Sequence, residues 1–169
     1  MQSVFNGNVR VNSPFQLKWR YSMKIAVASD HGGFEMKEAV KKHLEARGLE
    51  VLDLGTNSLE SVDYPVYGKL CGQAVVQGEA DLGVVCCGTG IGISIAANKV
   101  KGVRCAVATN IYMATMTKRH NNANVLALGG RVLASEDALA IVDAWLDTEF
   151  EGGRHERRTC MLDEMPADN

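Results

Sequence analysis

The fold of this chain is decided by residues 86–94, Cys86-Cys87-Gly88-Thr89-Gly90-Ile91-Gly92-Ile93-Ser94, where three glycines follow a pair of thiols. The preceding run, 82–86, is short and apolar, which is typical of a buried parallel strand. Residues 91–98 continue with apolar positions at helical spacing. N–H groups at a helix N-terminus favour negative charge, so this turn predicts a site for a phosphate or an enolate-like oxyanion. A thiol at Cys87 is biased there toward the thiolate form.

Short apolar strands alternate with amphipathic helices on both sides of this turn. Strands are expected at 25–28, 51–54, 82–86, 103–108 and 125–128, and helices at 34–47, 64–77, 91–98, 111–119 and from Ser135 to Leu146. This alternation predicts a single α/β domain with a doubly wound, Rossmann-like parallel sheet of five strands. Such sheets bind ligands at the carboxyl ends of their strands, so the loops that follow the strands are the place to look for chemistry.

Three of these loops carry polar or glycine-rich sequences. They are Ser29-Asp30-His31-Gly32-Gly33, the turn after Cys87, and Gly129-Gly130-Arg131. His120-Asn121-Asn122 follows a helix and precedes the fifth strand, so a longer loop would be needed to bring it to the same edge. Beyond the helix that begins at Ser135, residues 151–158 form a basic tail that starts with two glycines, Gly152 and Gly153.

The glycine turn does not fit the better-known glycine motifs. A dinucleotide fingerprint needs glycine at the position of Ile93 and an acidic residue after the next strand, where Thr109 and Asn110 stand. No P-loop sequence occurs in the chain. A cysteine phosphatase needs an arginine six residues after its cysteine, and Gly92 and Ile93 occupy the two possible positions. Nucleotide hydrolysis and phosphatase chemistry are therefore not expected.

The residues around the first and third strands also have purely structural interpretations. Cys87 could be a small buried residue that closes a strand, although its place before three glycines favours a function. Cys86 alternates to the other face of that strand and is expected to serve in packing. Asp30 could cap a helix, and His31 could be a solvated side chain that follows the cap.

The basic residues near the C-terminus have the same ambiguity. His120 could be a cation favoured by the negative end of a helix. Arg154 and Arg158 would share one face of a helix and could hold a phosphate. The alternative for this arginine pair is salt bridging with Glu151 or Glu156.

Composition narrows the class of protein. The 169 residues carry a net charge of −2 with no long basic run, so we expect one domain and no nucleic-acid partner. Five cysteines are an odd number and a poor disulfide framework, which favours a reducing cytoplasm. No cysteine and histidine grouping has zinc spacing, so we expect no metal. We also expect no membrane association.

The first 22 residues differ from the rest of the chain. They contain three basic residues and no acidic one, they show no periodicity, and they end just before Met23. We interpret 1–22 as an N-terminal extension, either because Met23 is the true start or because the segment has a targeting role. Residues 23–169 would form the domain.

Taken together, the segments resemble the ribose-5-phosphate isomerase B family, which shares a superfamily with the galactose-6-phosphate isomerase subunits. The resemblance covers about 24–158. Its motifs are Ser29-Asp30-His31-Gly32-Gly33, Asp63-Tyr64-Pro65, the run 87–99 that begins at Cys87, His120-Asn121 and Glu151-Gly152-Gly153-Arg154-His155. The resemblance implies a cofactor-free interconversion of D-ribose 5-phosphate and D-ribulose 5-phosphate, as in the pentose phosphate pathway.

The resemblance also implies roles for individual residues. Cys87 would be the base that moves a proton between carbons 2 and 1, and Thr89 would help through its hydroxyl. His120 would be the acid that opens the sugar ring, with Asp30 assisting at a sugar hydroxyl. The enediolate would be held by the backbone of residues Gly88, Thr89, Gly90, Ile91 and Gly92.

Further implied contacts involve a second subunit. Asn121 would hold the sugar or the enediolate, and the phosphate would be bound by His31, Arg131, Arg154 and Arg158. Some of these would come from the neighbouring subunit through the C-terminal tail, so a homodimer or a dimer of dimers is expected. A branch of the family uses a glutamate where this chain has Ile93, which places the chain with the cysteine branch. The alternatives are an isomerase of allose 6-phosphate or galactose 6-phosphate, and a sugar-phosphate binding module without turnover.

Overall fold

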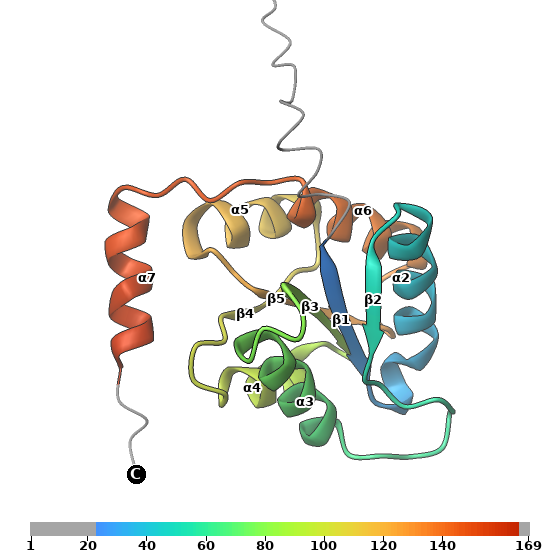
Figure 1. Cartoon of the computed structure of the whole chain (residues 1–169). Coiled ribbons are helices and arrows are strands. Elements are labelled where there is room, and N and C mark those ends of the chain that lie inside the picture. The colour runs from blue at the N-terminus through green and yellow to red at the C-terminus, as the bar shows by residue number, and fades with distance from the viewer. Residues whose placement is uncertain (1–22, 166–169) are drawn as a thin grey trace, which may run out of the picture.

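One parallel sheet organises the protein (Figure 1). The computed structural model describes residues 23–165, so the extension 1–22 and residues 166–169 lie outside the described part. The sheet has five strands in the order β2-β1-β3-β5-β4, all paired in parallel. The strands are β1 Lys24–Ser29, β2 Glu50–Asp53, β3 Leu82–Cys87, β4 Cys105–Val107 and β5 Val125–Gly129. This arrangement confirms the predicted doubly wound, Rossmann-like sheet.

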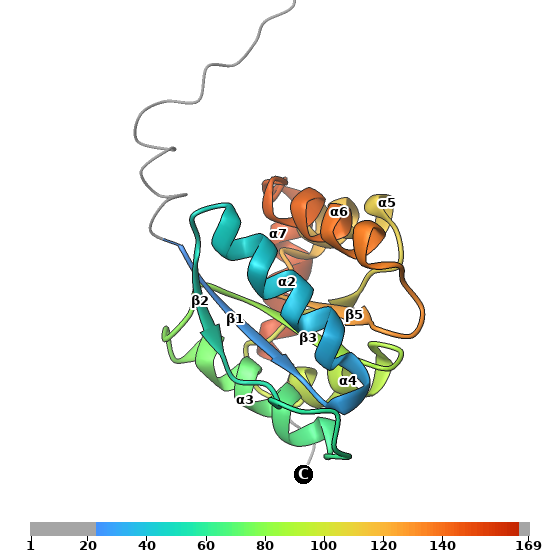
Figure 2. The ribbon, with the colours of Figure 1, turned by 90° about the vertical axis from the view of Figure 1, so that its right-hand side faces the viewer.

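Helices cover both faces of the sheet, as Figure 2 shows edge-on. One face carries α2 Phe34–Ala46, α5 Ile111–Asn121 and α6 Ser135–Leu146, and the other carries α3 Tyr64–Val76 and α4 Ile91–Asn98. A short 3₁₀ turn, η1 His31–Gly33, precedes α2. Within residues 23–165, no helix has the length and apolarity needed to cross a bilayer.

Alternation along the strands divides the core into two layers. In β1, Ile25 and Val27 pack beneath α2 and α6, whereas Ala26 and Ala28 pack toward α3 and α4. In β3 the same alternation sends Cys86 to the α2 and α6 face and Cys87 to the α3 and α4 face. The predicted separation of the two thiols is therefore confirmed.

Most elements begin and end within one residue of the prediction, and two elements differ by more. Strand β4 is shorter than the expected 103–108 because the N–H groups of Val103 and Arg104 donate to the Val100 carbonyl and the Asn124 side chain instead of a ladder partner. Helix α5 continues past the expected 119, so that His120 lies in its last turn and not in a loop.

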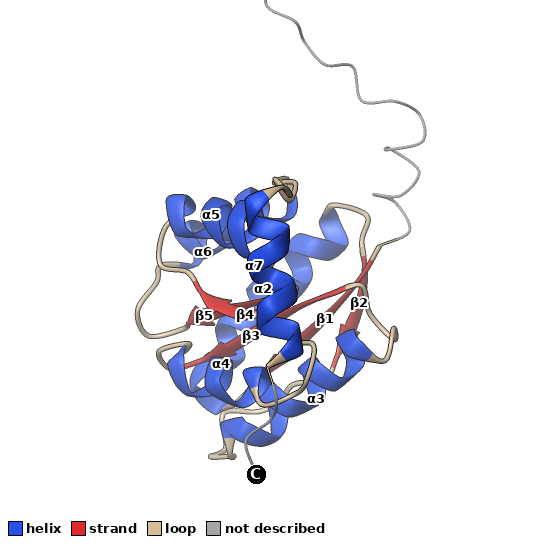
Figure 3. Ribbon diagram, turned by 90° about the vertical axis from the view of Figure 1, so that its left-hand side faces the viewer, coloured by secondary structure: helices blue, strands red, loops and turns tan. Residues whose placement is uncertain are grey.

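The basic tail is a helix, which the sequence analysis left as a hinged segment. Helix α7 Arg154–Glu164 begins after Gly152 and Gly153, whose φ values of 69° and 58° turn the chain sharply. Figure 3 shows α7 in front of the β4 edge of the sheet, and Figure 1 shows that it stands apart from that edge. It packs on α5 by burying His155 and Thr159, and the Arg104 guanidinium pairs with Asp163 near its end.

Candidate active site

The loops that follow β1, β3 and β5 meet at the carboxyl edge of the sheet, as the topology predicted. The Gly130 N–H donates to the Cys87 carbonyl at 2.8 Å, and the Arg131 N–H donates to the Gly88 carbonyl at 3.0 Å. A Cβ added at Gly32 would lie 3.0 Å from the Gly88 nitrogen. These contacts join three segments of the chain into one continuous backbone surface.

Glycine is required where the loops touch. A Cβ at Gly33 would lie 2.3 Å from the carbonyl carbon of Cys86, which no side chain tolerates. Gly90 has a φ of 78°, and a Cβ there would lie 2.9 Å from the carbonyl carbon of Leu128. The glycines therefore serve both the tight turn and the close approach of neighbouring loops.

Cys87 lies at the end of β3 with its sulfur beneath this turn. Its Sγ accepts the Gly90 N–H at 3.1 Å, and the residue is 5% exposed. The Thr89 hydroxyl accepts the Ile91 N–H at 3.3 Å on the exposed side of the turn. Cys86 is fully buried on the opposite face, where desolvation raises the pKa of its thiol far above the ordinary value. Only Cys87 of this pair faces the glycine turn.

Asp30 and His31 are held rigidly at the same edge. The Asp30 carboxylate accepts the Gly33 N–H at 3.1 Å and is 6% exposed, which confirms its capping role. His31 is not simply solvated, because its Nδ1 accepts the Val62 N–H at 3.2 Å. A ring nitrogen that accepts carries no proton, so Nε2 carries the ring proton and acts as a donor. The contact with Val62 comes from the loop before α3, and no signal in the sequence predicts it.

Arg131 supplies positive charge beside the turn. A Cβ added at Gly88 would lie 3.5 Å from Nη1 and 3.6 Å from Nε of Arg131, so the guanidinium lies alongside that glycine. Among residues 23–165, no carboxylate forms an ion pair with this guanidinium. An exposed, unpaired guanidinium next to backbone N–H groups is well suited to bind a phosphate.

The other predicted site residues lie at the opposite edge of the sheet. The side chain of Arg104, which immediately precedes β4, donates to the carbonyls of Asn121 and Asn122. The end of α5 is therefore beside the amino end of β4, and α5 itself spans about 16 Å from the carboxyl edge. Within one chain, His120 and Asn121 are thus not brought to Cys87.

His120 belongs to a second cluster, formed with the start of α7. Its ring stacks on that of His155, with centroids 4.2 Å apart and planes 4° apart. The Arg154 Nε donates to Nε2 of His155 at 3.3 Å, and desolvation together with His120 and Arg154 lowers the pKa of His155. Glu151 pairs with Arg119 at 3.0 Å. Among residues 23–165, Glu151 forms no ion pair with Arg154 or Arg158, so the salt-bridge interpretation is wrong for Glu151.

Arg154 and Arg158 are both exposed on α7, away from the glycine turn. Two groups of predicted site residues therefore exist. Asp30, His31, Cys87, Thr89 and Arg131 lie together at the carboxyl edge of the sheet, whereas the group of His120, Asn121, Arg154 and Arg158 lies beyond the amino end of β4.

Comparison with known proteins identifies the family. Residues 25–162 match the profile of a family described as Ribose/Galactose Isomerase. The chain belongs to this family. Ribose-5-phosphate isomerase B of Escherichia coli is 51% identical over 135 residues, which are 80% of this chain and 91% of that protein.

Solved structures of the family have the same fold. Clostridium thermocellum ribose-5-phosphate isomerase B is 56% identical and superposes with a TM-score of 0.83, covering 84% of this chain and 96% of that one. The Mycoplasma genitalium enzyme, solved with bound ribulose-5-phosphate, is 40% identical with a TM-score of 0.79, covering 83% of this chain and 93% of that one. The resemblance inferred from the sequence motifs is confirmed.

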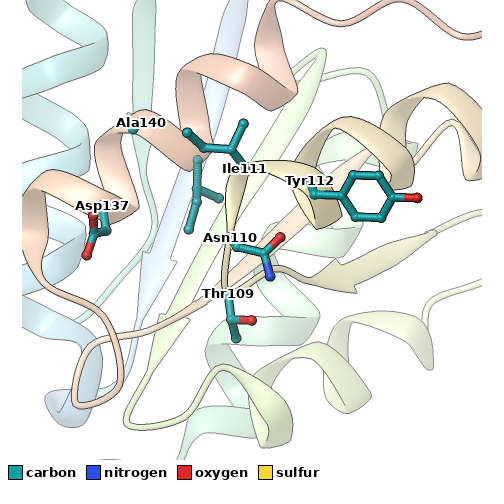
Figure 4. Close-up of a pocket in the computed structure, with 7 residues that line it drawn as sticks. Thr109, Asn110, Ile111, Tyr112, Asp137 and Ala140 are labelled. Carbon is teal, nitrogen blue, oxygen red and sulfur yellow. The ribbon is translucent and has the colours of Figure 1, made fainter.

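A separate pocket of about 530 Å³ lies where α5 begins, outside both groups of predicted residues (Figure 4). It is lined by Thr109, Asn110, Ile111, Tyr112, Asp137, Ala140 and Ile141. The Asn110 side chain is occupied in capping α5, because it accepts the Met113 N–H at 2.9 Å. The Tyr112 ring is 73% exposed and points away from Asp137. None of the site residues predicted in this isomerase family member lines the pocket.

Proposed function

We propose that this chain is an aldose-ketose isomerase that interconverts D-ribose 5-phosphate and D-ribulose 5-phosphate through an enediolate, without a cofactor. The observation that carries the proposal is Cys87, whose sulfur lies beneath a turn of backbone N–H groups with the unpaired Arg131 beside it. The names of the relatives support the same substrate, and one of them binds ribulose-5-phosphate.

The chemistry needs one group that accepts and returns a proton. The Cys87 thiolate removes the proton from carbon 2 of the open aldose, and the electron pair of that bond forms the enediolate. The negative charge on the enediolate oxygen is stabilised by N–H groups of the turn from Gly88 to Gly92, with the exposed Thr89 hydroxyl beside them. The hydroxyl proton moves from oxygen 2 to oxygen 1 of the enediolate, and the thiol returns its proton to carbon 1, which leaves the ketose and the thiolate. Asp30, at the same edge, would bind a sugar hydroxyl.

Ring opening and phosphate binding require the second group of residues. His120 would protonate the ring oxygen, Asn121 would hold the sugar, and the phosphate would be shared by His31, Arg131, Arg154 and Arg158. Because the two groups lie at opposite edges of the sheet, a complete site would form between Cys87 of one subunit and His120 of another. A homodimer is then the minimal active unit, alone or within a dimer of dimers.

An apolar surface is available for this association. Val66 and Leu70 on α3, together with Ile91 and Ile95 on α4, are between 41% and 56% exposed on two helices that pack side by side. Exposed apolar patches of this kind commonly mark subunit interfaces. Five free cysteines fit a reducing cytoplasm as the place of action.

The test is formation of ribulose 5-phosphate from ribose 5-phosphate by the purified full-length chain in the presence of a chelator, beside Cys87→Ala. Turnover that falls by at least about a hundredfold in the variant supports both the reaction and its base. Turnover of allose 6-phosphate or galactose 6-phosphate alone would move the assignment to six-carbon substrates. Absence of all three activities in a folded protein would leave a binding module.

A further inference from the structure

The cluster at the end of α5 contains three side chains of the types that bind transition metals. His120, Glu151 and His155 each offer one ligand atom, and these atoms all lie within 4.8 Å of one another. Nε2 of His120 lies 3.9 Å from Oε2 of Glu151. Their separation along the chain hides the cluster from a search for metal-ligand spacing.

Two of the three residues, His155 and Glu151, present lone pairs that already accept hydrogen bonds. The Arg154 Nε donates to Nε2 of His155, so that nitrogen presents a lone pair and not a proton. The Arg119 guanidinium donates to Oε2 of Glu151 at 3.0 Å. Both arginines are exposed, so a metal ion that binds the same lone pairs would displace their long side chains toward solvent.

The spacing is close to that of an occupied site. Zinc binds nitrogen and oxygen at about 2.0–2.2 Å, so tetrahedral ligand atoms lie about 3.3 Å apart. To bind one metal ion, the ligand atoms must therefore move by about 1 Å, and one imidazole ring must rotate out of the parallel stack. His120 and Glu151 can make these movements because they are 38% and 43% exposed, whereas the buried His155 is the fixed member.

We propose that His120, Glu151 and His155 form a binding site for a divalent transition-metal ion of the Zn²⁺ class, and that its occupation inhibits the enzyme. Two imidazoles and one carboxylate are a common zinc ligand set that leaves a fourth position for water. Inhibition rests on the proposed function, because a metal-bound His120 nitrogen cannot donate a proton to the sugar ring. Metal binding itself does not rest on it.

Binding is tested first, with the full-length chain, by calorimetric titration with Zn²⁺ and by the absorption spectrum with Co²⁺. Glu151→Gln is compared with Glu156→Gln, a matched exposed glutamate of the same tail. We expect the affinity to fall at least about tenfold for Glu151→Gln and to stay unchanged for Glu156→Gln. His155→Gln is compared in the same way with His43→Gln on α2. Equal affinities within either pair, or a Co²⁺ spectrum dominated by thiolate ligation, would overturn the proposal.

Inhibition is then measured as ribulose 5-phosphate formation with increasing Zn²⁺, followed by reversal with a chelator. Glu151→Gln should retain the activity measured without metal and need at least about ten times more Zn²⁺ for half inhibition. The same half-inhibiting concentration as in the parent chain would mean that zinc acts at Cys87, which contradicts the inhibitory role. If the chain binds Zn²⁺ through Glu151 but isomerises no ribose 5-phosphate, the proposed function fails and the metal site stands.

Discussion

The separation of the site residues into two groups predicts subunit complementation, in which two inactive variants restore activity when they form a mixed dimer. Cys87→Ala and His120→Asn should each abolish turnover in a pure homodimer. In a symmetric dimer whose sites each combine Cys87 of one subunit with His120 of the other, a mixed dimer contains one site with both residues intact. Its second site contains both substitutions. Mixing two inactive proteins should therefore restore activity.

The expected recovery follows from the counting of dimers. Random reassociation of equal amounts makes about half of the dimers mixed, and each mixed dimer has one intact site of two, so about a quarter of the parent activity returns. The pure variants remain at least about a hundredfold below the parent. Activity is measured as ribulose 5-phosphate formation after co-expression of the two chains with different affinity tags.

A second mixture tests the shared site by a loss of activity instead of a recovery. When the parent chain is mixed with the Cys87→Ala/His120→Asn double variant, a shared site predicts about a quarter of the parent activity, since every mixed dimer is inactive. A site contained within one chain predicts about half of the parent activity. The shared site would be refuted if the first mixture recovered no activity although mixed dimers were shown to form. It would also be refuted if the second mixture kept about half of the parent activity.

Three further substitutions test other parts of the structure. Cys86→Ala should keep the turnover within about twofold, because Cys86 only fills the core. It should lower the free energy of unfolding by about 1 kcal/mol, measured by urea denaturation. A loss of turnover equal to that of Cys87→Ala would contradict the assignment of strand faces. Burial over Trp145 lowers the pKa of Lys118 to about 8, so Lys118→Met should stabilise the protein by about 1 kcal/mol at pH 7. This gain should shrink above pH 8, where the folded parent chain loses the buried charge, and an equal gain at pH 9.5 would exclude that cause. Burial opposes ionisation of Asp53, but its hydrogen bonds from the buried Lys37 and from a second lysine outweigh that effect and lower its pKa. Asp53→Asn should therefore lower the free energy of unfolding by about 2 kcal/mol at neutral pH. This difference from the parent chain should shrink as the pH falls below about 4, where the parent carboxylate is protonated. A difference that persists at low pH would show that Asp53 stabilises the protein by packing and not by charge.

The fold was predictable because its signals are local. Alternating apolar strands and amphipathic helices leave few arrangements other than a doubly wound parallel sheet, and the position of Cys87 after a buried strand fixed the edge at which to look for chemistry. Helix α7 was not predicted. It buries little besides His155 and Thr159, so its sequence carries no continuous apolar stripe and the two glycines before it suggest a loop.

The site was predictable only in part, for a related reason. Asp30, Cys87 and Arg131 follow strands directly, so topology alone brings them together. The stack of His120 on His155 depends on how the tail returns across α5, which is a tertiary contact between segments with no shared pattern. Because His120 and His155 meet only through this tertiary contact, their spacing in the sequence did not indicate a group of metal ligands.

The close packing of the three loops limits how this enzyme can change. Where Gly33, Gly90 and Gly129 touch neighbouring backbone, no larger residue fits, so this half of the site has almost no room for variation. On the half formed by α5 and α7, the side chains of Asn121, Arg154 and Arg158 are exposed, so substitutions beside them meet little steric resistance. Divergence toward longer or shorter sugars should therefore accumulate around the group on α5 and α7, while the chemistry beside Cys87 stays constant. The half of the site beside Cys87 is thus sterically fixed, and the half beside α7 is where sugar preference can change.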